Sequence, residues 1–164
     1  MDWKCCEFPH LSTFELYAIL RARSSVFVVE SSHVRLDVDG RDERAWHVFA
    51  VEPGGDRCDV VAYARVLLGE EDDADIVIDK VLTGLHRRDD ETRNALIAHA
   101  LTTVRARWPE HAIRISTSLD QRTFYESFGF RKTVGPFFEH GTPCIGMVRR
   151  EAGAAPSGQS LPVF

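Results

Sequence analysis

The sequence lacks any apolar run long enough to cross a lipid bilayer, which excludes a protein built on membrane-spanning helices. Its N-terminus, MDWKCCEFPH, lacks the apolar stretch of a secretory signal. Cysteine is scarce: the four cysteines form no CxxC pair, and the adjacent Cys5 and Cys6 make a poor bridge to each other. We therefore expect free thiols in a cytoplasmic protein.

An excess of positive charge is also missing. The chain of 164 residues has a formal net charge of −5, which argues against non-specific nucleic-acid binding. Hydrophobic residues make up 44% and charged residues 27%, as in globular proteins with an ordinary core. The length fits one domain over residues 1–150, and the small, polar, proline-containing stretch 151–164 predicts a flexible tail.

The first half of the chain begins with a well-signalled helix. Ser12 and Glu15 have the spacing of a capping box, and the apolar face that follows is Leu16, Ile19 and Leu20.

Apolar segments separated by polar turns come next. The segment VFVV (26–29) precedes an acidic loop over 31–45. Two apolar stretches, 46–51 and 59–68, flank a Gly-Gly turn and predict an antiparallel pair of strands. A further strand is expected over 76–83.

The second half alternates helices and strands. A second helix is expected to begin near Asp90 and to end at Trp108. Its apolar face is Ile97, Ala100, Leu101 and Val104. A buried strand, a short helix and two final strands are expected at 112–117, 122–128, 130–138 and 143–150. This order predicts an α/β domain with a mixed sheet, antiparallel first and followed by a βαβ unit.

Three stretches resemble the ElaA-like branch of the GNAT superfamily of N-acyltransferases. They are ELYAILRARSSVFVVE followed by DVDGRD, then VVAYARVLL, then FYESFGF followed by FEHGTPCIGM. The resemblance covers most of residues 10–150 in the same order. It implies the GNAT fold, a mixed central sheet with splayed parallel strands flanked by helices. It also implies an enzyme that uses acetyl-CoA to acylate a small amine.

The resemblance places acetyl-CoA in the splay between the strands at 76–83 and 112–117. The backbone that pairs with the pantetheine would be Val81, Leu82 and Thr83. Arg88 and Arg93 would lie in the loop that wraps the pyrophosphate at the start of the second helix.

Glycine is missing where this loop needs it. The family pattern Arg/Gln-x-x-Gly-x-Gly/Ala falls on Arg88 to Arg93, and Glu91 and Arg93 replace its glycines. The carboxylates of Asp89, Asp90 and Glu91 would cap the helix and repel an anion. Two interpretations stay open: a degenerate acetyl-CoA loop with weak or absent affinity, which arginines partly rescue, or a capped helix start without a ligand.

Two residues are candidates for proton transfer. Tyr125 matches a family tyrosine that protonates the leaving thiolate, for which a phenol with pKa of about 10 is suited; the alternative is core packing. Glu30, which ends VFVVE, would face the acceptor site and take a proton from the amine; the alternative is a solvated glutamate at a strand end.

Histidines provide two further catalytic candidates. His47 could orient an acid or titrate near neutral pH, although a hydrogen-bonded structural role is the competing interpretation. In the final turn, His140 replaces the family's usual acid and Cys144 its usual histidine. If His33 and His47 converge on these two, a thiolate nucleophile or a zinc site could form. The favoured alternative is an inert, buried Cys144, a surface His140 and no metal.

The acidic loop and the splayed strand carry unusual charges. Asp37, Asp39 and Asp42 are expected to cap turns of the loop rather than recognise a cationic substrate. Asp79 and Lys80 stand where the family has Gly-Arg, which places a carboxylate near the thioester.

Three functions follow from these features. The first is N-acyl transfer to a small amine, with acetyl-CoA as donor, Glu30 as base and Tyr125 as acid. The second is a repurposed GNAT fold that does not bind acetyl-CoA and performs another small-molecule reaction or only binds. The third is an inactive partner that contributes an interface. Nucleic-acid and membrane partners are not expected, and homodimer formation stays open.

Overall fold

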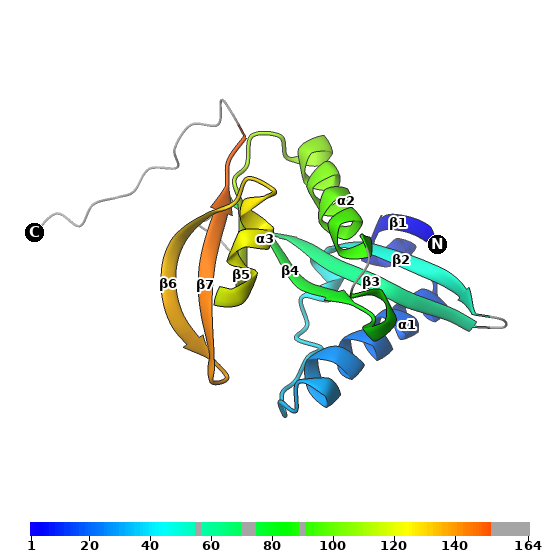
Figure 1. The fold of residues 1–164 in the computed structure, drawn as a ribbon. Coiled ribbons are helices and arrows are strands. Elements are labelled where there is room, and N and C mark those ends of the chain that lie inside the picture. Colours follow the sequence, from blue (N-terminus) through cyan, green and yellow to red (C-terminus); the bar gives the residue numbers. More distant parts are fainter. Residues whose placement is uncertain (55–56, 70–74, 89–90, 152–164) are drawn as a thin grey trace, which may run out of the picture.

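The computed structural model describes residues 1–54, 57–69, 75–88 and 91–151 (Figure 1). Residues 152–164 of the predicted tail lie outside the described residues, as do Asp89 and Asp90 of the predicted pyrophosphate loop. Among the described helices, none combines the length and the apolar character that a membrane span requires.

The described residues form one seven-stranded sheet, ordered β1-β2-β3-β4-β5-β7-β6. The strands are β1 (Asp2–Glu7), β2 (Trp46–Gly54), β3 (Arg57–Leu68), β4 (Ile76–Thr83), β5 (Ile113–Ser118), β6 (Arg131–Glu139) and β7 (Thr142–Arg149). The helices are α1 (Thr13–Ser24), α2 (Thr92–Arg107) and α3 (Arg122–Glu126), and a π-helix, η2 (Ser25–Glu30), continues α1. Short 3-10 turns are η1 (Phe8–His10), η3 (Asp42–Arg44), η4 (Leu85–Arg87) and η5 (Leu119–Gln121).

The predicted capping box at the start of α1 is confirmed. The Ser12 hydroxyl accepts from the backbone N–H of Glu15 at 3.2 Å, and the Glu15 carboxylate accepts from the backbone N–H of Ser12 at 2.9 Å. This reciprocal pair satisfies two amides that the first helical turn leaves without partners.

Two segments differ from the expectation. The segment 26–29 is π-helical rather than a strand, because the wide turn carries α1 onward and the Ser31 amide donates back to Val26. The first strand, β1, is missing from the sequence-based interpretation, because DWKCCE shows no regular alternation of apolar residues. It pairs antiparallel with β2 along its whole length.

Helices cover both faces of the sheet. In Figure 1, α2 lies over one face and α1 over the other. Successive side chains of β2 point to opposite faces of the sheet and so belong to two separate hydrophobic cores. Val48 and Ala50 pack in the core under α2. Phe49 packs with Ala18 and Ile19 of α1 in the core on the other face. The predicted apolar face of α2 is buried as expected.

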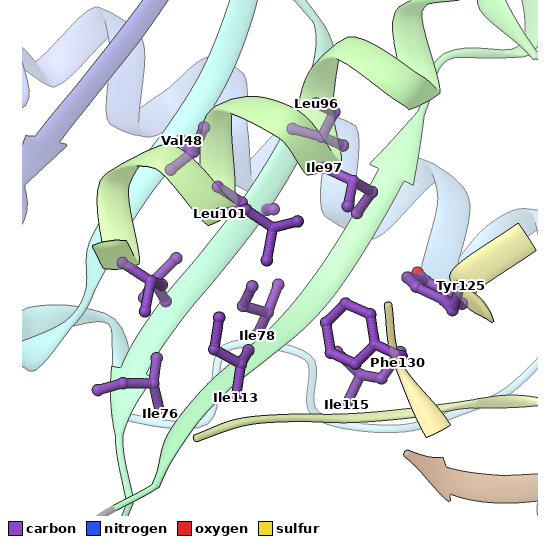
Figure 2. Packing of buried hydrophobic residues seen from close by; sticks show 14 of the residues in the cluster. Val48, Ile76, Ile78, Leu96, Ile97, Leu101, Ile113, Ile115, Tyr125 and Phe130 are labelled. Carbon is purple, nitrogen blue, oxygen red and sulfur yellow. The ribbon is translucent and has the colours of Figure 1, made fainter. Parts of the chain in front are cut away.

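The predicted mixed sheet is confirmed. β2 and β3 are antiparallel, and β4, α2 and β5 form the βαβ unit with a parallel strand pair. Figure 2 shows α2 side chains, among them Ile97 and Leu101, above Ile78 of β4 and Ile113 of β5. This core fixes the two parallel strands at their N-terminal ends and leaves their C-terminal ends free to diverge.

Candidate active site

The two parallel strands separate shortly after they begin. In the described part of the chain, β4 and β5 pair only at Ile76↔Ile113 and Val77↔Arg114, while their outer neighbours β3 and β7 stay paired with them further along. Among the residues that the structure describes, the facing backbone groups beyond these pairs have no strand partner across the gap. Backbone amides and carbonyls need a hydrogen-bond partner, and a bound molecule can provide one.

A bulge in β4 lies next to this splay. Two residues, Lys80 and Val81, lie opposite the single residue Ala64 of β3. Lys80 adopts a φ of 51°, which is uncommon for any residue except glycine. Its ammonium donates to the Asp37 carboxylate at 2.7 Å, and this ion pair helps to hold the unusual conformation.

One cavity spans the splay at the N-terminal end of α2, and we call it the α2 pocket. It has a volume of about 290 Å³. Its lining is Val26, Val81, Leu82, Thr83, Arg88, Arg93, Thr117, Gln121 and Tyr125. Every residue that the family resemblance assigned to acetyl-CoA therefore lines one cavity, together with the candidate acid Tyr125.

A second cavity, of about 430 Å³, lies beside the acidic loop, and we call it the loop pocket. Its lining is Phe27, Arg35, Val77, Ile78, Asp79, Lys80, Val81, Ile115, Ser116, Thr117, Tyr125 and Glu139. Val81, Thr117 and Tyr125 line both cavities, so the two meet inside the splay. A molecule in one pocket can therefore contact a molecule in the other.

Tyr125 packs in the core and also lines both pockets, so its position is compatible with both interpretations of it. Its side chain packs at the edge of the core (Figure 2), with ring centroids 5.0 Å from Phe124 and 5.9 Å from Phe130. Burial raises the pKa of its hydroxyl, and the neighbouring Arg93 acts against this rise. The phenol therefore stays protonated at neutral pH and can donate a proton where the pockets meet.

Two guanidinium groups lie in the α2 pocket. Arg93 stacks on Phe124, with Cζ 3.7 Å from the ring centroid, which fixes its position near the start of α2. Arg88 forms a bidentate pair with Glu30, in which Nη2 donates to Oε2 at 2.7 Å. Glu91 is the N-cap of α2 but makes no side-chain cap bond, contrary to the capping expected of it.

Glu30 lies away from the pocket in which it was expected. Its side chain lines a third cavity, of about 510 Å³, between α1 and η4, whereas Tyr125 belongs to the α2 and loop pockets. The hydrogen bond from Arg88 lowers the pKa of the Glu30 carboxyl, which weakens this group as a base.

The aspartates of the acidic loop form a buried ion-pair network instead of mainly capping turns. Arg23 donates to Asp37 at 2.8 Å and to Asp42 at 2.6 Å, and Arg65 donates to Asp42 at 2.9 Å and to Asp39 at 2.7 Å. Both arginine side chains are fully buried. Asp39 additionally accepts a backbone N–H within the loop, so turn capping occurs there as a secondary role.

The two unusual charges of β4 belong to the same network. Arg65 binds Asp79 through two parallel hydrogen bonds of 2.8 Å each, and Lys80 binds Asp37. The Asp79 carboxylate beside the splay is therefore neutralised by a guanidinium fork.

His47 lies inside the protein rather than in these pockets. Nδ1 is 2.9 Å from the Tyr63 hydroxyl, and Nε2 is 3.0 Å from the Asp42 carbonyl oxygen. The side chain is fully buried, and burial lowers its pKa below the usual value. Both ring nitrogens are engaged by protein groups, which is the arrangement of a structural histidine.

The histidine and cysteine candidates converge only in part. The rings of His33 and His140 lie 5.0 Å apart, but His47 bonds Tyr63 elsewhere and the Cys144 thiol is buried. Burial, reinforced by the charge of Glu139, raises the pKa of Cys144 and disfavours a thiolate. Among the described residues, no group of three or more potential ligands is arranged to hold a metal ion.

Two residues of the loop pocket escaped the sequence-based interpretation. Arg35 and Glu139 come from loop and strand-end positions far apart in the chain, and both line the loop pocket. The family motif FEHGTPCIGM includes Glu139, but nothing in the sequence alone connects it with Arg35.

The comparisons with known proteins agree with the fold. The protein ElaA of Escherichia coli (strain K12) is 32% identical over 149 residues, 91% of this chain and 96% of ElaA. The crystal structure of Escherichia coli ElaA superposes with a TM-score of 0.84 over 91% of this chain and 99% of that one. An acyl-CoA N-acyltransferase from Pseudomonas aeruginosa, 29% identical, gives a TM-score of 0.84 over the same shares, 91% and 99%. No protein-family model matches the chain. On the identity and coverage shared with ElaA, the chain belongs to the ElaA-like branch of the GNAT superfamily.

Proposed function

We propose that this protein is an N-acyltransferase that moves an acyl group from acyl-CoA to a small amine. The observation that carries the proposal is the meeting of two cavities at Val81, Thr117 and Tyr125. Transfer between two bound molecules needs such a junction, because reacting atoms must approach to about 3–3.5 Å. The related Pseudomonas aeruginosa structure is described as an acyl-CoA N-acyltransferase, which supports the assignment.

The lining of the α2 pocket supports the binding of an acyl-CoA there. Backbone groups of Val81 to Thr83 face the splay and would pair with the pantetheine amides. Arg88 and Arg93 would meet the pyrophosphate at the N-terminal end of a 16-residue helix. The bound acyl-CoA supplies the acyl group as an activated thioester.

Protein groups move the protons of the reaction. Glu139 lines the loop pocket and takes one proton from the acceptor ammonium, which frees the nitrogen to bond the acyl carbon. Tyr125 donates its hydroxyl proton to the sulfur as the carbon–sulfur bond breaks, and it recovers a proton from the nitrogen as the amide forms. Glu139 replaces Glu30 as the candidate base because it shares a cavity with Tyr125.

One observation favours the second candidate, a GNAT fold that does not bind acetyl-CoA. The Arg88 guanidinium already has a carboxylate partner, Glu30, at the place where a pyrophosphate would lie. A ligand must separate this pair or bind beside it, which lowers its affinity.

Calorimetric titration with acetyl-CoA and with coenzyme A separates the two candidates. We expect saturable binding to the unaltered protein and roughly tenfold weaker binding to Arg93→Gln, since a charge-assisted hydrogen bond is lost. Arg107→Gln is the matched control: this arginine lies near the other end of α2 and also stacks on an aromatic ring, Trp46, at 3.6 Å.

Absence of binding at millimolar acetyl-CoA would reject the acyltransferase proposal and leave the second candidate. Equal weakening in Arg93→Gln and Arg107→Gln would show that helix stability, rather than the pocket guanidinium, controls affinity.

A further inference from the structure

The loop pocket is lined by charged side chains of both signs. Four charged side chains line it: Arg35, Asp79, Lys80 and Glu139. Asp79 and Lys80 belong to the buried network and have ion-pair partners there. Arg35 and Glu139 take part in none of the ion pairs found among residues 1–54, 57–69, 75–88 and 91–151. Within the described part of the chain, the cavity is therefore lined by one cation and one anion that have no ion-pair partner.

Arg35 has unused hydrogen-bonding capacity. Its Nε is buried and has no hydrogen-bond partner among the described residues, an arrangement that is costly unless a bound molecule supplies an acceptor. Its Cζ lies 5.8 Å from the centre of the Phe27 ring, and the Lys80 ammonium lies 5.7 Å from the same ring. Because Lys80 is already paired with Asp37, Arg35 is the cation of this wall that can bind a carboxylate, whose geometry its guanidinium fork matches.

Glu139 provides a negative group on another segment of the same cavity. It pairs with Thr142 at the turn between β6 and β7, and the next residue, His140, contacts His33 of the acidic loop. This ring contact joins the turn that carries Glu139 to the loop that carries Arg35. The two charges therefore lie on neighbouring segments.

We infer that the acceptor is a zwitterion of the α-amino-acid type, with its carboxylate on Arg35 and its ammonium on Glu139. This inference rests on the proposed acyl transfer, because it names the amine that Glu139 deprotonates. A simple amine would leave Arg35 without a partner, and a dicarboxylate would be repelled by Glu139. A volume of about 430 Å³ leaves room for a side chain besides the charged groups.

The first experiment compares matched acceptors with acetyl-CoA as donor. The common L-α-amino acids are assayed beside their amides and their decarboxylated amines, such as leucine, leucinamide and 3-methylbutylamine. Release of coenzyme A is followed with a thiol reagent. We expect at least one free amino acid to exceed both its amide and its amine by roughly tenfold or more in kcat/KM, since a charge-assisted pair is lost in each analogue.

Variants assign the two charges. Arg35→Gln is expected to lower kcat/KM for the amino acid about tenfold while leaving the decarboxylated amine unchanged. Glu139→Gln is expected to slow all acceptors, because it removes the base. Lys132→Gln and Glu110→Gln are the controls, since both residues are exposed and belong to none of the three cavities described above.

Binding measured without acyl donor makes the two proposals separable. Saturation-transfer NMR with free amino acids reports on the loop pocket alone, and calorimetry with acetyl-CoA reports on the α2 pocket alone. Acetyl-CoA binding without amino-acid binding or turnover would overturn the inference and leave the acyltransferase proposal standing. Amino-acid binding that Arg35→Gln abolishes, without acetyl-CoA binding, would support zwitterion recognition and reject acyl transfer. An Arg35→Gln variant that slows amines and amino acids equally would also overturn the inference.

Discussion

The buried His47 gives the protein a pH-dependent stability. Burial, with a smaller contribution from Arg23 and Arg65, lowers the pKa of His47 from 6.5, and contacts with Asp42 oppose this shift. The unfolded chain therefore takes up a proton below about pH 6.5 that the folded protein does not bind. We expect the free energy of unfolding, measured with urea, to decrease as the pH is lowered from about 7.5 to about 5.5. This group contributes a decrease of at most about 1.4 kcal/mol per pH unit.

A pair of variants tests the assignment to His47. His47→Gln is expected to be less stable at every pH, because it disturbs the bonds to Tyr63 and Asp42, and to lose most of the slope with pH. His86→Gln, in the exposed turn η4, should retain the slope. A slope that is unchanged in His47→Gln would contradict the argument.

At the same scale, the sequence predicts some site residues and misses others for a physical reason. The family resemblance indicated the residues of β4 and the two arginines near α2, which are local to one strand–helix unit, and the structure places them around one cavity. Arg35 and Glu139 acquire meaning only through their shared cavity. Glu30 shows the opposite case. The sequence marked Glu30 as a candidate residue, but it could not reveal that Glu30 pairs with Arg88, which lies far away in the chain.

Among the elements, the π-helix η2 determines where Glu30 lies. The segment 26–29, with three valines and one phenylalanine, has the composition of a strand, but it continues α1 and directs Glu30 towards Arg88. We expect Glu30→Gln to bind acetyl-CoA roughly two- to fivefold more tightly than the unaltered protein, since Arg88 becomes available to the pyrophosphate. Calorimetry measures the change.

Glu151→Gln is the matched control for this variant. Its carboxylate also pairs with arginines, Arg105 and Arg149, but it lines none of the three cavities described above. Weaker binding in Glu30→Gln would mean that the Arg88–Glu30 pair organises the site instead of competing with the ligand. Tighter binding in both variants would point to net charge as the cause.

Elements were predictable where periodicity or capping was strong. Helix α2 and strands β2 to β5 have long apolar patterns, and their packing follows from those patterns. The strand β1 was not predictable, because it is short and it forms a strand through its pairing with β2 rather than through its own composition. The family resemblance predicted the splay of β4 and β5, which the periodicity of the sequence alone did not indicate.

In the molecule as a whole, the buried ion-pair network joins parts of the chain that the sequence keeps apart. Through Arg23 and Arg65 it links α1, the acidic loop, β3 and β4. The sequence reveals the charges, but their pairing depends on the tertiary fold. The network also connects structure to function, because it fixes the loop that carries Arg35 and supports the bulge at Lys80.

The fully buried Arg65 is the centre of this network, so its removal should affect both stability and the loop pocket. Arg65→Met leaves the carboxylates of Asp39, Asp42 and Asp79 without their shared partner, and we expect urea denaturation to show a loss of about 3–5 kcal/mol. Removing one of these charges as well, in Arg65→Met with Asp79→Leu, should restore part of that loss, because fewer buried carboxylates then lack a cation. Additive losses in the double variant would show that the arginine and the aspartate stabilise the fold independently, and the network would then not act as one unit.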